Sequence, residues 1–191
     1  MPAVARAFVA VEPPAAVVAA VDARVSALQR ARDAPGLRWG RHWHATLQFL
    51  GRVDDPAAVS EELARAVRDV EPPTVRLGAA GAFPRARRGT VLWLGFTEGR
   101  DALSDLAGVV ADATAPLGFA AEGRRSRFQP HVTVARAGSA RDLRPLVDAL
   151  GDEPVGSEWC IRSVVLLASD TRPDGARYSE VRCFPLRGEP V

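Results

Sequence analysis

Two short segments, His44-Ala45-Thr46-Leu47 and His131-Val132-Thr133-Val134, share one pattern: histidine, apolar residue, threonine, apolar residue. The chain has 3 histidines, so the use of two of them in a repeated pattern is hard to ascribe to chance. In a β-strand, residues i and i+2 point to the same face. If each segment is a strand, it therefore presents an imidazole and a hydroxyl side by side, with its apolar residues on the core side.

This pairing of side chains suits acid–base chemistry on a phosphate. Because histidine exchanges protons near neutral pH, His44 and His131 could act as base and acid across a cyclic phosphodiester. The attacking and leaving oxygens lie roughly in line across phosphorus, which matches opposed imidazoles. Thr46 and Thr133 could donate hydrogen bonds to the non-bridging oxygens, where negative charge develops. The scheme needs no metal. The alternatives are histidines satisfied in a core and threonines present as ordinary strand formers.

The bulk composition is that of an ordinary globular protein. The 191 residues are 47% hydrophobic and 25% charged, and they can bury a core as one domain or as two lobes that share a sheet. A net charge of +2 excludes a general nucleic-acid coat, so any contact with nucleic acid must come from local basic clusters. The 2 cysteines form no CxxC motif, which argues against a zinc site. The start lacks a signal-peptide pattern, and no apolar run approaches the ~20 residues of a spanning helix. We expect a cytoplasmic protein without membrane contact.

The order of the predicted elements indicates an internal duplication. The alternation and turn signals predict strands over 5–11, 37–39, 44–50, 74–83, 90–96, 128–136, 159–169 and 177–185. Helical spacing and caps predict helices over 15–32, from Asp55-Pro56 to about Val70, over 100–115, and from an N-cap at Ser139 to about Leu150. Each half then has a helix, a His-Thr strand, a second helix, a long strand, a turn and a returning strand.

We therefore predict an α+β fold with two pseudo-symmetric lobes. Each lobe is expected to be an antiparallel sheet with helices packed outside, and the lobes face each other across a central cleft that holds both His-Thr segments. The lobes cover approximately residues 1–96 and 97–191, and an exchange of strands between them is left open. No low-complexity linker separates them, so we expect a single domain over residues 1–191, and a monomer.

Two arginine clusters are candidate contacts for an RNA backbone. Arg85, Arg87 and Arg88 form one basic loop, and Arg124, Arg125 and Arg127 form another. All 25 basic residues of this chain are arginine, which reduces the information carried by any one of them. A solvated loop is therefore an equal alternative for each cluster.

Three further residues invite a functional interpretation. Phe49 and Phe128 could stack on a base, as aromatic side chains do in proteins that bind single strands, although core packing is the favoured role for both. His42 shares the strand parity of His44, which could suggest a metal pair. No third ligand is evident, so we interpret His42 as a rim residue.

The chain resembles the 2H phosphoesterases. The strings Trp39…His44-Ala45-Thr46-Leu47-Gln48-Phe49-Leu50-Gly51 and Phe128-Gln129-Pro130-His131-Val132-Thr133-Val134-Ala135-Arg136 are similar to the two signatures of that superfamily. Among its branches they look most like the RNA 2′,3′-cyclic phosphodiesterases, also called 2′-5′ RNA ligases. The resemblance extends over the whole chain through the strings Phe8-Val9-Ala10-Val11, Phe83-Pro84 with the arginines that follow, Val91-Leu92-Trp93-Leu94, and Tyr178…Phe184-Pro185-Leu186.

The resemblance implies that RNA with a 2′,3′-cyclic phosphate end is hydrolysed to a 2′-phosphate without a cofactor. It also implies that His44 protonates the O3′ leaving group, that His131 activates water and that Arg136 holds the phosphate. The residues alone do not distinguish the two histidine roles. Simple alternation puts Arg136 on the opposite face from His131, so its role requires the strand to twist or end before it. Other functions remain open: another cyclic phosphate as substrate, or a catalytically idle RNA-binding module.

Overall fold

The computed structural model describes residues 1–32, 34–119, 128–172 and 175–188. Within these ranges it confirms an α+β fold. The strands are β1 (Val4–Val11), β2 (Leu37–Trp39), β3 (Ala45–Val53), β4 (Thr74–Phe83), β5 (Gly89–Glu98), β6 (Val132–Arg141), β7 (Val155–Cys160), β8 (Ser163–Arg172) and β9 (Gly175–Pro185). The helices are α1 (Ala15–Ala31), α2 (Pro56–Val67), α3 (Arg100–Thr114) and α4 (Arg144–Leu150), with short 3₁₀ turns η1 (Ala86–Arg88) and η2 (Ala115–Leu117).

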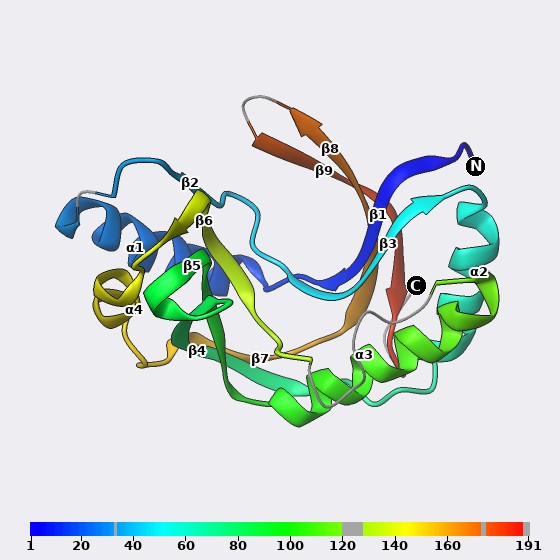
Figure 1. Ribbon diagram of the computed structural model, residues 1–191. Helices are drawn as coiled ribbons and strands as arrows, with labels where there is room; N and C mark the ends of the chain where they lie inside the picture. Colours follow the sequence, from blue (N-terminus) through cyan, green and yellow to red (C-terminus); the bar gives the residue numbers. More distant parts are fainter. Residues whose placement is uncertain (33, 120–127, 173–174, 189–191) are drawn as a thin grey trace.

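The strands form one curled antiparallel sheet in the order β7-β4-β5-β6-β3-β1-β8-β9, and β2 pairs with β6 beside β3 (Figure 1). We call β7, β4, β5, β6 and β2 the β6 lobe, and β3, β1, β8 and β9 the β3 lobe. The two lobes of the sheet are joined where β3 meets β6, through the residue pair Ala45 and Val132. Each lobe draws strands from both halves of the chain, because β1 pairs with β8 and β5 pairs with β6.

The helices lie on the outer face of this curled sheet (Figure 1). In the β6 lobe, α1 packs on β7 and α4 packs on β4, whereas in the β3 lobe α3 packs on β3 and α2 packs on β9. Helix α2 starts as its sequence predicts, because the Asp55 carboxylate accepts hydrogen bonds from the backbone N–H groups of Ala57 and Ala58. In the described part of the chain, no helix is long and apolar enough to cross a membrane.

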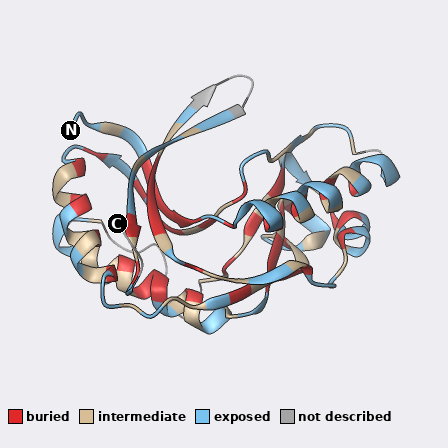
Figure 2. Cartoon of the chain, turned by 180° about the vertical axis from the view of Figure 1, so that it is seen from behind, coloured by how far each residue is buried: buried red, intermediate tan, exposed pale blue. Residues whose placement is uncertain are grey.

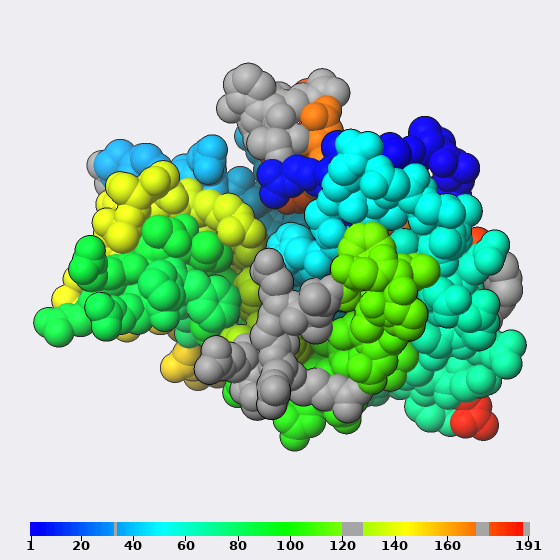
Figure 3. Space-filling view, turned by 45° about the vertical axis from the view of Figure 1, so that its right-hand side comes forward, coloured from blue at the N-terminus to red at the C-terminus, as the bar shows by residue number. Residues whose placement is uncertain are grey.

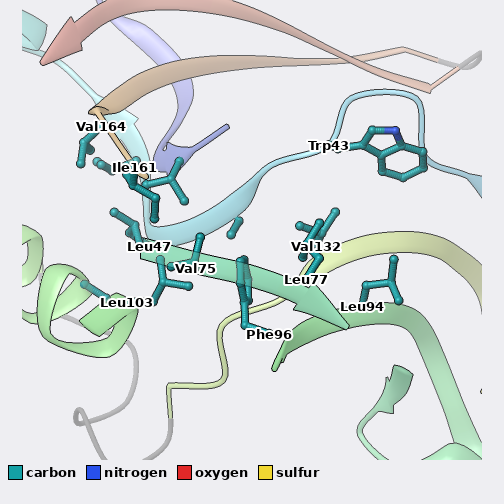
Figure 4. Packing of buried hydrophobic residues seen from close by; sticks show 14 of the residues in the cluster. Trp43, Leu47, Val75, Leu77, Leu94, Phe96, Leu103, Val132, Ile161 and Val164 are labelled. Carbon is teal, nitrogen blue, oxygen red and sulfur yellow. The ribbon is translucent and has the colours of Figure 1, made fainter. Parts of the chain in front are cut away.

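The main hydrophobic core fills the space between the sheet and the helices and runs through both lobes (Figure 2). It includes the predicted apolar stripe of α1, namely Val17, Val21, Val25 and Leu28. Figure 4 shows Leu47 of β3, Val132 of β6 and Trp43 within this core. A second, smaller cluster lies in the β3 lobe and is formed by Phe8, Ala10, Val165 and Leu167, with Tyr178 packed against it. Because neighbouring residues of β1 belong to the main core, this cluster lies on the opposite, inner face of the sheet.

Two predicted boundaries were wrong. Ser139 is not a helix N-cap, because β6 continues through it to Arg141, which pairs with Gly89 of β5; α4 begins only at Arg144. The apolar run 159–169 is not one strand, because the chain leaves the ladder after Cys160 and re-enters it at Ser163. The first part, β7, pairs with β4 in the β6 lobe, and the second, β8, pairs with β1 in the β3 lobe.

Candidate active site

The two His-Thr segments meet where β3 joins β6. Ala45 lies directly opposite Val132 in this antiparallel pair, so the flanking positions bring His44 toward Thr133 and Thr46 toward His131. Residues that face each other across an antiparallel pair project from the same side of the sheet. Ala45 and Val132 belong to the main core, and the four His and Thr side chains are half-buried on the inner face. The two segments therefore meet, as predicted, and they do so side by side on adjacent strands of one sheet.

Aromatic rings surround His44 on the β3 lobe. The centroid of its imidazole lies 5.0 Å from the ring of Phe8 and 5.0 Å from that of Tyr178, the latter in an edge-on arrangement at 80°. Burial lowers the pKa of His44 to about 4, aided by the charges of Arg136, His42 and His131 and partly opposed by a hydrogen bond to the His42 backbone. His44 is therefore neutral at pH 7 in the unliganded protein.

His131 has a matching environment on the β6 lobe. Its ring centroid lies 4.9 Å from that of Phe83, edge-on at 80°, and 6.2 Å from that of Trp93. Nδ1 lies 2.8 Å from the carbonyl oxygen of Gln129, and since a carbonyl only accepts, Nδ1 carries the proton and Nε2 is left free. Burial lowers the pKa of His131, with a smaller contribution from the charge of Arg136. Both imidazoles are thus held as neutral groups that an anion between them would help to protonate.

Arg136 reaches the inner face through a β-bulge in β6. In the β5–β6 ladder, Trp93 pairs with Thr133 and Val91 pairs with Arg136, with a register shift between them. Since Val91 and Trp93 are two residues apart on β5, their partners Thr133 and Arg136 share a face although they are three apart. A guanidinium N–H of Arg136 donates to Thr133 Oγ1 at 3.4 Å. Simple alternation would put Arg136 on the opposite face of the strand from His131. Because of the bulge, Arg136 lies on the same face as His131.

Phe49 reaches the inner face in the same way. On the β1–β3 ladder, Ala10 pairs with Thr46 and Phe8 pairs with Phe49, again with a register shift between them. The ring of Phe49 lies 5.9 Å from that of Phe8, and its side chain is 60% exposed. The favoured prediction of core packing was wrong for Phe49, because the bulge turns it away from the core. Phe128 does pack against the main core, as predicted.

The remaining candidates are the two arginine clusters and His42. Arg85, Arg87 and Arg88 are exposed on and beside η1, part of the surface of the β6 lobe (green in Figure 3). This loop begins directly after Phe83, whose ring contacts His131. Arg124, Arg125 and Arg127 lie outside the described residues. His42 is exposed, with its ring edge-on to Tyr178 at 6.0 Å, as expected of a rim residue.

Sequence reasoning missed the aromatic residues that flank the histidines. Phe8 and Tyr178 come from β1 and β9 at opposite ends of the chain, whereas Phe83 and Trp93 come from the neighbouring strands β4 and β5, and the sheet order brings all four to the site. Their only signal was their place in strings that resemble the 2H phosphoesterases. Within the described ranges, no three His, Cys, Asp or Glu side chains come together in a way that could hold a metal ion.

Comparison with known proteins finds a matching family model and similar relatives. A family model described as the 2′-5′ RNA ligase superfamily matches residues 13–173. An RNA 2′,3′-cyclic phosphodiesterase of Aeropyrum pernix is 39% identical over 121 residues, which cover 61% of this chain and 66% of that relative. A protein of the same name from Aquifex aeolicus is 30% identical over 151 residues, covering 76% and 78% of the two chains.

Solved structures share the fold over nearly the whole chain. The crystal structure of TT0787 of Thermus thermophilus matches with a TM-score of 0.76 and 27% identity, covering 96% of this chain and 99% of that one. Escherichia coli LigT in its apo form matches with a TM-score of 0.71 and 26% identity, covering 98% and 99%. Because the family model spans most of the sequence and these structures align end to end, the chain belongs to the 2′-5′ RNA ligase superfamily.

Proposed function

We propose that this protein hydrolyses the 2′,3′-cyclic phosphate end of RNA to a 2′-phosphomonoester by metal-independent acid–base catalysis with two histidines. The observation that carries the proposal is the pairing of Ala45 with Val132, which puts the His-Thr segments on one face. The names of the relatives from Aeropyrum pernix and Aquifex aeolicus support the substrate, because both are RNA 2′,3′-cyclic phosphodiesterases.

The reaction divides between the two lobes. His131 takes a proton from water at its free Nε2, and the water oxygen forms a bond to phosphorus. The bond from phosphorus to O3′ breaks on the opposite side, and His44 donates a proton to O3′. The phosphate stays on O2′. The lowered pKa of His44 makes its protonated form a readier proton donor. The charge of the bound phosphate raises this pKa, so that His44 takes up a proton from solvent before the reaction.

Three groups bind the phosphate itself. Thr46 and Thr133 donate hydrogen bonds to the non-bridging oxygens from the two lobes, and Arg136 adds a positive charge beside Thr133. The Arg136 guanidinium matches the geometry of two phosphate oxygens, so it also fixes the direction in which the ester enters. As the negative charge on these oxygens grows in the transition state, all three contacts become stronger.

Further contacts hold the RNA. Phe49 offers an exposed ring on the inner face for stacking of a base. Arg85, Arg87 and Arg88, together with Arg125 and Arg127, are proposed to contact the RNA backbone. One chain supplies both histidines, so we propose that residues 1–191 act as a single domain and a monomer. We also propose that the protein acts in the cytoplasm.

A direct assay tests the proposal. The protein is incubated with a 2′,3′-cyclic mononucleotide in EDTA, and the product is identified as the 2′- or the 3′-monophosphate. We expect 2′-monophosphate at an undiminished rate in the chelator, and its loss in His44→Ala and His131→Ala. His42→Ala is the matched control, because it removes the third histidine at the rim and should retain activity. Binding without turnover would favour an RNA-binding module, and turnover of other cyclic phosphates alone would favour a different substrate.

A further inference from the structure

Arg38 lies next to Arg136 on the face that carries the histidines. In the β2–β6 ladder, Arg38 is directly opposite Arg136, and Trp39 is opposite Ala135. Leu37 and Trp39 pack against the main core on one side of β2, so Arg38 projects to the other side, as its partner does. The sequence alone did not single out Arg38, because an isolated arginine in an arginine-rich chain is usually a solvated surface residue.

This cross-strand pair is unfavourable without an anion. Like charges directly opposite each other destabilise a sheet. Both side chains are exposed, and among the described residues neither forms an ion pair with a carboxylate. The hydrogen bond of Arg136 goes to the neutral hydroxyl of Thr133. A negatively charged group bound between or beside the two guanidinium groups would relieve the repulsion.

The position of the pair relative to the proposed catalytic phosphate points to a second phosphate. Arg136 and Thr133 face β5 positions two residues apart, which corresponds to about 6.6 Å along a strand. Arg38 lies on β2, which is the strand next to β6 on the side away from β5, about 4.8 Å from β6. Arg136 can thus contact a phosphate bound at Thr133, while Arg38 reaches the next anionic group, at a separation comparable with that of consecutive phosphates in RNA.

We propose that Arg38 binds the phosphodiester that joins the cyclic-ended nucleotide to its 5′ neighbour. The protein then prefers oligonucleotide ends to cyclic mononucleotides. This inference rests on the proposed function, since it assumes that the cyclic phosphate lies between His44 and His131.

A comparison of three substrates tests Arg38. They are a 2′,3′-cyclic mononucleotide, a dinucleotide with the same cyclic end, and that dinucleotide with an uncharged methylphosphonate linkage. In Arg38→Ala, we expect kcat/KM for the charged dinucleotide to fall about fivefold to tenfold more than for the other two, mainly through KM. Arg38→Lys should keep part of the preference. Arg30→Ala on α1 is the control of equal charge, and its substrate preference should match that of the wild type.

The failure of this inference differs from the failure of the proposed function. If the wild type hydrolyses the cyclic substrates but Arg38→Ala affects charged and uncharged dinucleotides equally, the inference is overturned and the function stands. If the wild type hydrolyses none of them, the function fails, and Arg38 is tested by binding of a dinucleotide with a terminal 2′-phosphate. The plot of log affinity against log salt should then be less steep for Arg38→Ala than for the wild type. An unchanged slope would overturn the inference.

Discussion

The two His-Thr strands share a histidine, a threonine and a bulge, and they differ in the residue that the bulge brings to the inner face. Both β3 and β6 present a histidine and a threonine on the inner face, and both contain a bulge just after the threonine. In each strand the bulge brings the residue five positions after the histidine to the same face. On β6 that residue is Arg136, and on β3 it is Phe49.

In the proposed function, this difference makes the two sides of the site distinguishable. The shared histidines and threonines could accept a cyclic phosphate in either of two orientations. A cation on one side and an exposed aromatic ring on the other make the sides distinguishable, because phosphate prefers the first and a base prefers the second. In the proposed function, the duplicated histidines and threonines carry out the reaction, and the unmatched Arg136 and Phe49 orient the substrate.

The largest expected effect concerns the histidines themselves. His44→Ala and His131→Ala should each lower kcat about 10²- to 10⁴-fold on a cyclic mononucleotide. The roles separate with a phosphodiester whose leaving group is p-nitrophenol, which needs no protonation. On that substrate His44→Ala should lose much less activity than His131→Ala, as measured by release of nitrophenolate. Equal losses in the two variants would contradict the assignment of His44 as the acid.

Substitution of Arg136 or of Phe49 gives the next largest effect. Arg136→Ala should lower kcat/KM roughly 10²-fold or more on every cyclic phosphate, since it removes a charge that stabilises the transition state. Phe49→Ala should lower kcat/KM roughly fivefold or more for nucleotides, through KM, and leave a base-free ribose 2′,3′-cyclic phosphate little affected. Phe49→Trp keeps an aromatic face and should retain the preference for a base. If Phe49→Ala affects the base-free substrate to the same degree, the ring has no stacking role.

Protonation of the buried histidines should make stability depend on pH. Because the pKa of His44 is about 4 when folded and near 6.5 when unfolded, the unfolded chain binds a proton that the folded chain rejects between these values. The stability that neutral His44 contributes is present above pH 6.5 and is lost as the pH falls toward 4. The loss is on the order of 3 kcal/mol, measured as the free energy of unfolding in urea.

A variant isolates this contribution from that of the carboxylates. His44→Gln does not titrate, so its stability should fall less than that of the wild type between pH 7 and pH 4.5. Inorganic phosphate should reduce the loss in the wild type, because an anion beside His44 favours its charged form. The same pH dependence in His44→Gln and the wild type would show that His44 is not the group responsible.

Much of this molecule could be predicted from the sequence because its signals are local. The alternating strand of β1, the helical stripe of α1 and the Asp55-Pro56 start of α2 depend on near neighbours, and the structure has them where the pattern predicts. The repeated His-Thr pattern also predicted that two segments far apart in the sequence meet at one site. Its repetition, with few histidines in the chain, made the pairing informative.

What could not be predicted depends on non-local geometry. A bulge is set by the partner strand, so simple alternation placed Arg136 on the wrong face, and nothing near Phe49 marked it as exposed. The apolar run 159–169 also gives no local sign of the break after Cys160. The break is set by the sheet, because there the chain passes from one lobe to the other. Arg38 became informative only through its cross-strand neighbour.

The smallest expected effect concerns the residue that each bulge turns toward the main core. On β6 the residue turned toward the core is the small apolar Ala135. On β3 it is Gln48, which is 7% exposed. Gln48 Oε1 accepts a hydrogen bond of 2.8 Å from the buried hydroxyl of Thr114 on α3. Thr114→Val keeps the shape and removes the donor, so the free energy of unfolding should fall by about 1–2 kcal/mol, seen as a drop in Tm of about 2–8 °C. Turnover should change less than in Phe49→Ala, since the chemistry lies on the other face. A large loss of kcat without a loss of stability would contradict this expectation. It would mean that α3 sets the position of Thr46 through Gln48, a role that the bulge of β6 does not share because Ala135 forms no such hydrogen bond with its side chain.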